Sequence, residues 1–156
     1  MWKPTNGFFP SLDSQLNVGT VNGKTLYLHY TNEEAGRIIG GSLVINDKRR
    51  NETRAGSASG IYLCPSTYTF SPENVVDLLF LGEKQYQDRG KWLVAFGFTP
   101  TETLTDERVT QGSWVRELIY MGAEISFDVK DLVYSERNPF PNLFDQSGHP
   151  LKGVYF

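Results

Sequence analysis

Short runs of apolar residues, separated by polar and glycine-containing stretches, follow one another along most of the chain. Runs of roughly four to eight residues that are rich in β-branched and aromatic side chains predict β-strands. Six runs meet this description, at residues 25–30, 42–46, 60–64, 91–98, 114–120 and 124–129. The run at 91–98 is apolar almost throughout, so we expect a central strand that is buried on both faces. Only Met-Gly-Ala separates the last two runs, which predicts a β-hairpin.

The segment TNEEAGRIIGG carries the signals of a short helix. Thr31 is placed to cap its N-terminus, and Glu34 stands three residues later, where it completes a capping box. Ile38 and Ile39 are expected to face the core, and the glycine pair that follows them is expected to end the helix.

A second helix is predicted in SPENVVDLLFLG. Ser71 is a suitable N-cap, Pro72 suits the first helical position, and Gly82 suits the end. Two further stretches, 47–59 and 99–113, are too polar for a core and are expected to be long loops.

The order of these elements predicts the fold class. Because the helices come early and the strands late, without alternating βαβ units, we expect an α+β fold built around antiparallel sheet. A length of 156 residues suits one domain. Residues 1–24 are interpreted as an irregular lead-in, and residues 135–156 as a tail without an assigned structure.

Composition narrows the classes of function. A content of 39% hydrophobic and 13% aromatic residues predicts a folded globule. No run of about 18 apolar residues is present, and the first residues lack the basic start and apolar core of a secretory signal. We therefore expect a protein that acts in the cytosol, without a membrane partner. The net charge of −3 provides no general attraction to nucleic acid, although a local patch would still allow binding.

Several common cofactor sites find no support in the sequence. With one cysteine and two histidines, a zinc site is not expected, and we expect no metal. No GxxxxGK[ST] is present, and the glycines of AGSASG precede a predicted strand instead of a helix, so neither dominant nucleotide-binding signature is met. A Ser-His-Asp triad stays open, but no GxSxG elbow supports it.

Three polar residues within predicted strands are candidates for chemistry: His29, Tyr62 and Glu117. A histidine beside strand aromatics is ordinarily a hydrogen-bonded structural residue, and a tyrosine in a strand needs no function to explain it. Glu117 is different, because strand alternation puts its carboxylate on the same face as Val115 and Ile119. A carboxylate in such a place is costly unless it is used.

The order and the surroundings of these residues carry more information than each residue alone. The segment LYLHYTNEEAGRIIGGSLVI, then a polar loop, then SGIYLCP resembles the bacterial toxin branch of the ADP-ribosyltransferases, in the diphtheria-toxin-like His-Tyr-Glu class. That branch typically opens with a strand ending in His-Tyr-Thr, here residues 29–31, and continues with a short helix and a Gly-x-Tyr-Leu strand, here starting at Gly60. The similarity covers residues 25–65 well and 91–130 loosely.

This resemblance implies an NAD-dependent mono-ADP-ribosyltransferase with a compact, split antiparallel sheet core and short helices. Such an enzyme breaks the bond between nicotinamide and ribose through an oxocarbenium-like transition state. Glu117 would be the catalytic carboxylate that stabilises this cation. Tyr62 would pack on the nicotinamide ring, and His29 would hydrogen-bond a ribose hydroxyl.

Neighbouring residues would complete the NAD site. The backbone at Tyr30 would bind the carboxamide, and Thr31 and Gly60 belong to the two NAD-binding motifs. Arg54, together with the Arg-Arg pair of the same loop, is suited to the pyrophosphate, because guanidinium makes bidentate contacts with phosphate. A solvated loop that is kept soluble by its charge explains these arginines equally well.

The resemblance also implies a biological setting. Such domains are toxins or effectors that act in the cytosol of a target cell after delivery by a secretion system, and they usually travel with an immunity or antitoxin protein. The acceptor of ADP-ribose would be a macromolecule, with protein favoured and nucleic acid left open. The loop at 99–113 occupies the position that contacts the target in that family, and Gln111 and Trp114 lie at its end.

Several alternatives stay open. Val115 stands where many arginine- or asparagine-modifying members have Glu or Gln, so the acceptor is not identified. Tyr68 and Phe70 both qualify as a second aromatic of the site, and Glu124 is the rival of Glu117, which we prefer because it directly follows the polar loop. An NAD glycohydrolase on the same fold would pass ADP-ribose to water. A non-catalytic, β-rich binding module is the alternative from a different class.

Overall fold

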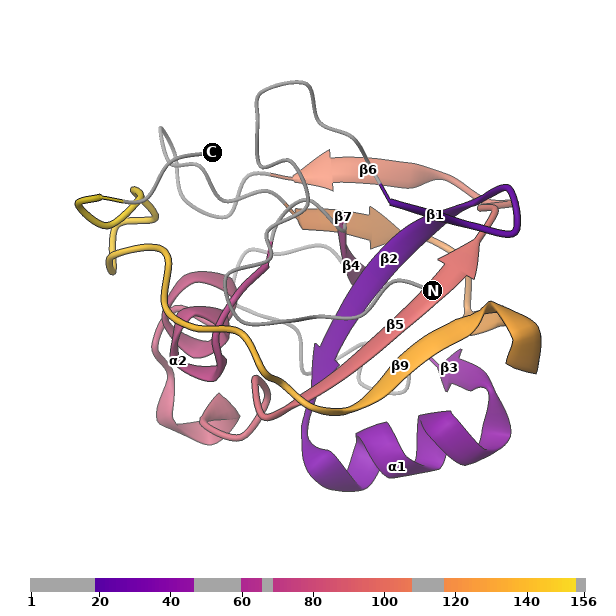
Figure 1. The fold of residues 1–156 in the computed structure, drawn as a ribbon, viewed down its shortest axis with the longest axis horizontal. Coiled ribbons are helices and arrows are strands. Elements are labelled where there is room, and N and C mark those ends of the chain that lie inside the picture. Colours follow the sequence, from indigo (N-terminus) through magenta and orange to yellow (C-terminus); the bar gives the residue numbers. More distant parts are fainter. Residues whose placement is uncertain (1–18, 47–59, 66–68, 108–116, 154–156) are drawn as a thin grey trace.

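A computed structural model describes residues 19–46, 60–65, 69–107 and 117–153 (Figure 1). Its strands are β1 (Thr20–Val21), β2 (Lys24–Thr31), β3 (Val44–Asn46), β4 (Ile61–Pro65), β5 (Trp92–Phe98), β6 (Leu104–Glu107), β7 (Glu117–Tyr120), β8 (Glu124–Ser126) and β9 (Leu132–Arg137). Its helices are α1 (Glu33–Ser42) and α2 (Pro72–Asn74), which continues as a π-helical turn (Val75–Leu79). Two 3-10 turns, Lys84–Tyr86 and Val129–Asp131, complete the described elements.

The structure is a mixed α+β fold, as the order of elements predicts. Seven strands form one sheet in the order β6-β7-β4-β2-β5-β9, with β1 paired to β2, and β3 and β8 form a second, small sheet. All described strand pairs are antiparallel. Strand β5 lies between β2 and β9 and is buried from Trp92 to Gly97, so the expected central strand is confirmed.

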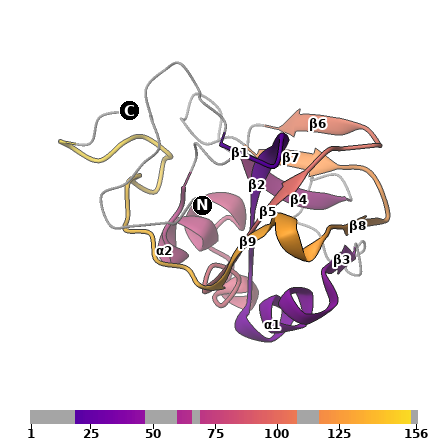
Figure 2. The same ribbon diagram turned by 45° about the vertical axis from the view of Figure 1, so that its right-hand side comes forward.

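Two hydrophobic clusters cover the two faces of β2 and β5. Figure 2 shows α2 on one side of these strands and α1 with the small sheet on the other. One face packs against α2 and the segment that follows β9, and its cluster includes Leu26, Leu28, Tyr30, Cys64, Phe70, Leu78, Leu93, Phe140 and Phe144. The other face packs against α1 and the small sheet, and its cluster includes Tyr27, Ile39, Ile45, Leu63, Trp92, Val94, Phe96, Leu118 and Ile125. Alternation along each strand therefore decides which cluster a side chain joins.

Helix α1 is present, but its predicted ends are wrong by one or two residues. The cap is Asn32, whose Oδ1 accepts a hydrogen bond from the Ala35 N–H at 2.7 Å. Thr31 is not the cap, because it is still part of the β2 ladder. The helix extends past the glycine pair to a left-handed residue, Leu43, with φ of 62°. Ile38 is 58% exposed instead of facing the core, since its neighbour along the helix takes the buried position.

The end signals of the second helix are confirmed. The Ser71 hydroxyl accepts a hydrogen bond from the Asn74 N–H at 2.9 Å, and Pro72 is the first helical residue. Gly82 follows the helical segment with φ of 69°, and its N–H donates to the Val76 carbonyl at 2.8 Å. The two hydrogen bonds satisfy the Asn74 N–H and the Val76 carbonyl, which belong to the backbone groups that helix ends leave without an intrahelical partner.

Three strand predictions are wrong. Strands β7 and β8 do not form a hairpin, because β7 is buried between β6 and β4 while β8 pairs with β3 in the small sheet. Strand β6 lies inside the predicted loop 99–113. The tail 135–156, for which the sequence predicts no particular structure, begins within β9. The lead-in 1–24 contains β1 and the first residue of β2. These strands are short, and β1 has only two residues, so the local apolar pattern that would mark them in the sequence is weak.

A buried carboxylate fastens the β1–β2 hairpin to the start of β9. Asp131 is 0% exposed, and it accepts hydrogen bonds from Lys24 Nζ at 2.6 Å and Asn22 Nδ2 at 2.9 Å. Asn22 also donates to the Lys130 carbonyl at 3.1 Å. The hydrogen bonds from Lys24 and Asn22 lower the pKa of Asp131, and the hydrogen bond to Asp131 raises the pKa of Lys24.

We expect Asp131→Asn to lower the melting temperature by several degrees at neutral pH, because it removes the charge that Lys24 faces. The matched control is Asp128→Asn, an exposed aspartate three residues earlier, which should shift the melting temperature little. Since the folded-state pKa of Asp131 is lowered, its stabilisation is present at neutral pH and is lost as the pH falls below about 4. A difference between Asp131→Asn and the parent that persists unchanged at low pH would contradict this account.

Candidate active site

The strand order brings the three candidate residues together. Strand β4 lies between β2 and β7, so His29, Tyr62 and Glu117 stand on three neighbouring strands. The Nδ1 atom of His29 lies 2.9 Å from the carbonyl oxygen of Tyr62. His29 and Tyr62, which are 33 residues apart in the sequence, thus meet where β2 and β4 adjoin. By strand alternation, His29 lies on the face of its partner Val94, which α1 covers, whereas the side chains of Tyr62 and Glu117 lie on the other face.

The sheet opens where His29 and Tyr62 meet. On its other side, β2 pairs with β5 over seven consecutive residue pairs, from Thr25↔Phe98 to Thr31↔Trp92. Among the residues that the structure describes, its pairing with β4 comprises Tyr27↔Pro65 and Leu28↔Cys64. The next pairs in this register would involve residues 29–31 and 61–63, but there the His29 ring takes the Tyr62 carbonyl, which a regular ladder would give to a backbone N–H. The histidine side chain therefore stands at a split between two parts of the sheet.

The backbone of Tyr30 is directed toward this split. The Leu26 N–H donates to the Gly19 carbonyl at 2.8 Å, on the side of β2 opposite to β5. Backbone groups of alternate strand residues point to the same side, so those of Leu28 and Tyr30 also point away from β5 and toward β4. The Tyr30 N–H and C=O are thus placed beside the His29 ring, at the opening of the sheet.

The environment of His29 determines its protonation. A carbonyl oxygen only accepts hydrogen bonds, so Nδ1 of His29 carries the proton that it donates to Tyr62. Burial lowers the pKa of His29, and the hydrogen bond to the Tyr62 carbonyl opposes this only in part. The ring is consequently neutral at pH 7, and its Nε2 atom presents a lone pair that accepts a hydrogen bond.

Glu117 is 3% exposed, at the first position of β7. Its neighbours along the strand, Leu118 and Tyr120, belong to the cluster beneath α1, so Glu117 and Ile119 point to the opposite face. Tyr62 pairs with Ile119, and it therefore shares this face with Glu117 as a diagonal neighbour, at roughly 7 Å between backbones. The carboxylate and the half-buried tyrosine lie side by side.

The rival carboxylate lies elsewhere. Glu124 begins β8 in the small sheet, where it pairs with Asn46, and it is exposed. It has no place in the ladder that joins β2, β4 and β7. The geometry thus brings Glu117, and not Glu124, next to Tyr62.

The side chains of the other motif residues have structural roles. The Tyr30 hydroxyl accepts a hydrogen bond from the Phe70 N–H at 2.9 Å, and both rings are buried in the core on the α2 side. Phe70 is 0% exposed, so it offers no open face as a second aromatic of the site, and Tyr68 lies outside the described residues. Thr31 is buried at the end of β2. Of the triplet 29–31, only the His29 ring and the backbone are directed toward the split.

Gly60 is required by the packing of β4 on β7. Its φ of 151° is a conformation that side chains rarely adopt, and a Cβ there would lie 2.4 Å from Cγ2 of Ile119 and 2.8 Å from the Tyr120 carbonyl oxygen. The glycine of the Gly-x-Tyr-Leu motif therefore has a steric reason in this chain, whatever it contacts in a ligand.

Some predicted residues cannot be placed, since they lie outside the described part of the chain. These are Arg49, Arg50, Arg54, Gln111, Trp114 and Val115. Among the described residues, no group of three or more His, Cys, Asp or Glu side chains is arranged to hold a metal ion. The helices in these same ranges are all too short or too polar to span a bilayer.

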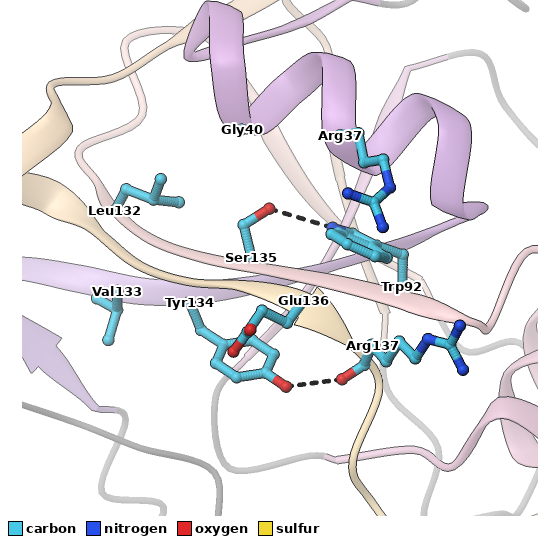
Figure 3. A pocket seen from close by; sticks show the side chains of 9 residues that line it. All are labelled: Arg37, Gly40, Trp92, Leu132, Val133, Tyr134, Ser135, Glu136 and Arg137. Carbon is cyan, nitrogen blue, oxygen red and sulfur yellow. Dashed lines mark hydrogen bonds between the residues drawn. The ribbon is translucent and has the colours of Figure 1, made fainter.

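The hollow in the protein surface does not coincide with the split between β2 and β4. A hollow of about 910 Å³ lies between α1 and β9, lined by Arg37, Gly40, Trp92 and all six residues of β9 (Figure 3). His29, Tyr62 and Glu117 are not among its lining residues. The case for a site at the split therefore depends on the strand geometry and not on the hollow.

The sequence predicts a role for the Tyr62 ring, but it does not show that the Tyr62 carbonyl is the group that binds His29. That oxygen fixes the orientation and the tautomer of His29. No sequence signal marks it, because its role depends on where two strands separate. Comparisons of the chain with models of protein families, with curated proteins and with solved structures found no match.

The tautomer and the charge of His29 are open to direct measurement. We expect ¹⁵N-resolved NMR of the imidazole to show a neutral ring with the proton on Nδ1 at pH 7, and a titration midpoint below about 6.5. His149→Ala simplifies the assignment without touching the sheet, since His149 is an exposed residue in the segment that follows β9. A ring protonated on Nε2 alone, or a midpoint above the ordinary range, would show that the Tyr62 carbonyl does not hold His29.

Proposed function

We propose that this chain is an NAD-dependent mono-ADP-ribosyltransferase whose active site is the split between β2 and β4. The observation that carries the proposal is the His29 ring held on the Tyr62 carbonyl, with the buried Glu117 carboxylate on the next strand. The three residue types are those of the His-Tyr-Glu class that the sequence resembles, in the same order along the chain. The contact between His29 and the Tyr62 carbonyl supports the assignment, because it does not follow from the sequence spacing.

The chemistry explains why a buried carboxylate is useful at this point. As the bond between ribose C1′ and the nicotinamide nitrogen breaks, nicotinamide leaves with the electron pair and positive charge develops on the ribose. A fixed carboxylate stabilises that charge most where water is excluded. Glu117, at 3% exposure, meets this requirement. The acceptor then forms the new bond to C1′ and loses a proton.

The other groups of the split suit the two ends of the scissile bond. The His29 Nε2 lone pair accepts a hydrogen bond from a ribose hydroxyl, because Nδ1 is committed to Tyr62. The Tyr30 backbone offers one donor and one acceptor to the carboxamide, which needs both. The Tyr62 ring, half-buried on the Glu117 side of β4, is suited to pack on nicotinamide.

The proposal extends to the setting in which the activity is used. On the strength of the resemblance, we assign the chain to the toxins and effectors that act in the cytosol of a target cell, with a macromolecular acceptor and a neutralising partner protein. Incubation with labelled NAD and a cell lysate tests this part separately. Label on a macromolecule identifies a transferase, whereas nicotinamide release without labelled product identifies a glycohydrolase on the same site.

Glu117→Gln keeps the shape of the side chain and removes its charge. Nicotinamide release should fall by about a hundredfold or more, while NAD affinity changes little, because the carboxylate acts on the transition state. Glu124→Gln is the matched control and should retain the parent rate. A large loss in the control with little loss at Glu117 would move the catalytic role to β8.

His29→Ala and Tyr62→Ala remove contacts that NAD makes before the bond breaks. Each should weaken NAD binding by about tenfold or more, measured by calorimetry or by the rise in melting temperature with NAD. His149→Ala is the control, since this exposed histidine lies outside the sheet. Unchanged NAD affinity in both site variants, with the fold intact, would return His29 and Tyr62 to purely structural roles.

A further inference from the structure

In the part of the chain that the structure describes, the outer edge of β9 presents backbone groups without a strand to pair with them. Among the described residues, β9 is the last strand of the sheet and pairs only with β5. Asn138 directly follows β9, and its N–H donates a hydrogen bond of 2.9 Å to the carbonyl of Lys91, the residue just before β5. The backbone N–H of Asn138 therefore points toward β5. By alternation, the N–H and C=O groups of Ser135 and Arg137 point away from β5. An edge with such groups is a template for a further strand.

This edge is bounded on both sides. A β-bulge between Ala95 and Phe96 shifts the register at the start of β9, so the regular part of the edge begins at Tyr134. At the other end, the Tyr134 hydroxyl donates to the Arg137 carbonyl at 2.7 Å, which occupies that acceptor. Three outward backbone groups are then left for a partner: the N–H and C=O of Ser135 and the N–H of Arg137. They suffice to form hydrogen bonds with a short extended peptide.

The side chains around this edge form the hollow between α1 and β9 (Figure 3). Arg37 covers the Trp92 ring at 4.9 Å, and the Trp92 indole N–H donates to the Ser135 hydroxyl at 3.1 Å. Tyr, Trp and Arg are the residue types that contribute most to binding at protein interfaces.

One carboxylate serves two guanidinium groups in this place. Glu33 lies 3.5 Å from Arg37 and 3.8 Å from Arg137, and the side chains of the two arginines are 64% and 84% exposed. Glu136 also lines the hollow, but by alternation along β9 it lies on the face opposite to Ser135 and Arg137. On the face that α1 covers, two guanidinium groups therefore share one carboxylate, although the chain carries a net charge of −3. A second carboxylate would complete the pairing, and arginine is suited to bind it through two hydrogen bonds.

We propose that the outer edge of β9 binds an extended, acidic segment of a protein partner, which adds to the sheet as a further strand. The unpaired groups at Ser135 and Arg137 require a peptide backbone, because a nucleic acid or a small anion does not offer donors and acceptors at strand spacing. A partner residue that pairs with Ser135 or Arg137 has its side chain on the same face of the sheet as they do. That face is the one that α1 covers, where Arg37 and Arg137 lie, so the acidic residue stands at this position.

This surface is separate from the proposed active site. Strands β2 and β5 lie between the β2–β4 split and the edge of β9. A partner strand on β9 therefore leaves NAD binding unchanged, and the inference stands or falls independently of the proposed enzymatic activity.

The test uses the full chain to select from a displayed library of random linear peptides. We expect the enriched peptides to carry Asp or Glu flanked by strand-forming residues, and their binding to shift the backbone amide signals of Ser135 and Arg137 in ¹⁵N NMR spectra. The double variant Arg37→Gln with Arg137→Gln should bind these peptides at least about tenfold more weakly. Lys152→Gln, a loss of one exposed charge in the segment after β9, should bind them as the parent does.

A pair of variants at Ser135 separates strand addition from contact by side chains alone. Both Ser135→Ala and Ser135→Pro lose the hydroxyl that binds Trp92, but only proline also removes the outward N–H, and an edge strand tolerates proline there. Binding should survive in the alanine variant and fall at least about tenfold in the proline variant. Peptides without an acidic preference, binding unaffected by the arginine changes, or enrichment at the β6 edge would overturn the proposal. Self-association of the chain through β9 would also overturn it, since the occupant would then be a second copy.

Discussion

The hydrogen bond from the His29 ring to the Tyr62 carbonyl is the constraint on which the candidate site depends. Among the described residues, β2 and β4 are joined by two backbone pairs, and one of these involves Pro65, which has no N–H to donate. The strands β6, β7 and β4 are thus linked to β2, β5 and β9 by a short ladder that ends at a side chain. Because His29 takes the carbonyl that would continue the ladder, the sheet opens there, and a neutral imidazole lies beside the backbone groups of Tyr30 and Tyr62.

The burial of Tyr30 and Glu117 determines which groups near this opening are available for chemistry. The Tyr30 ring is buried in the core on the α2 side, where its hydroxyl binds the Phe70 N–H. The ring is therefore not available to a ligand, and the backbone of Tyr30 is the part that faces the split. The same sheet carries the carboxylate of Glu117 into a position with 3% exposure. A charge in such a place is expensive for stability and valuable for a reaction that develops positive charge nearby. This balance is the physical reason for treating the three residues as one site.

The sequence predicted the parts of the fold that depend on local signals. Ser71, Pro72 and Gly82 mark the second helix correctly, since capping and the conformation of glycine are properties of a few adjacent residues. The central strand was found because an unbroken apolar run leaves little choice. The hairpin between β7 and β8 was wrong because a short turn sequence does not determine which distant strands compete for each edge. For the candidate site, the sequence predicts residue types and their order, whereas the place where β2 and β4 separate depends on non-local strand pairing.

The most direct test of the central claim is a titration of NAD into the ¹⁵N-labelled chain, followed by NMR. The account predicts that the largest shifts occur in the amides of residues 29–31, at Gly60 and Tyr62, and at Glu117, while the amides of β9 stay in place. In the His29→Ala variant these shifts should need at least about tenfold more NAD. No response at millimolar NAD, or shifts confined to another part of the sheet, would contradict the assignment of the β2–β4 split as an NAD site.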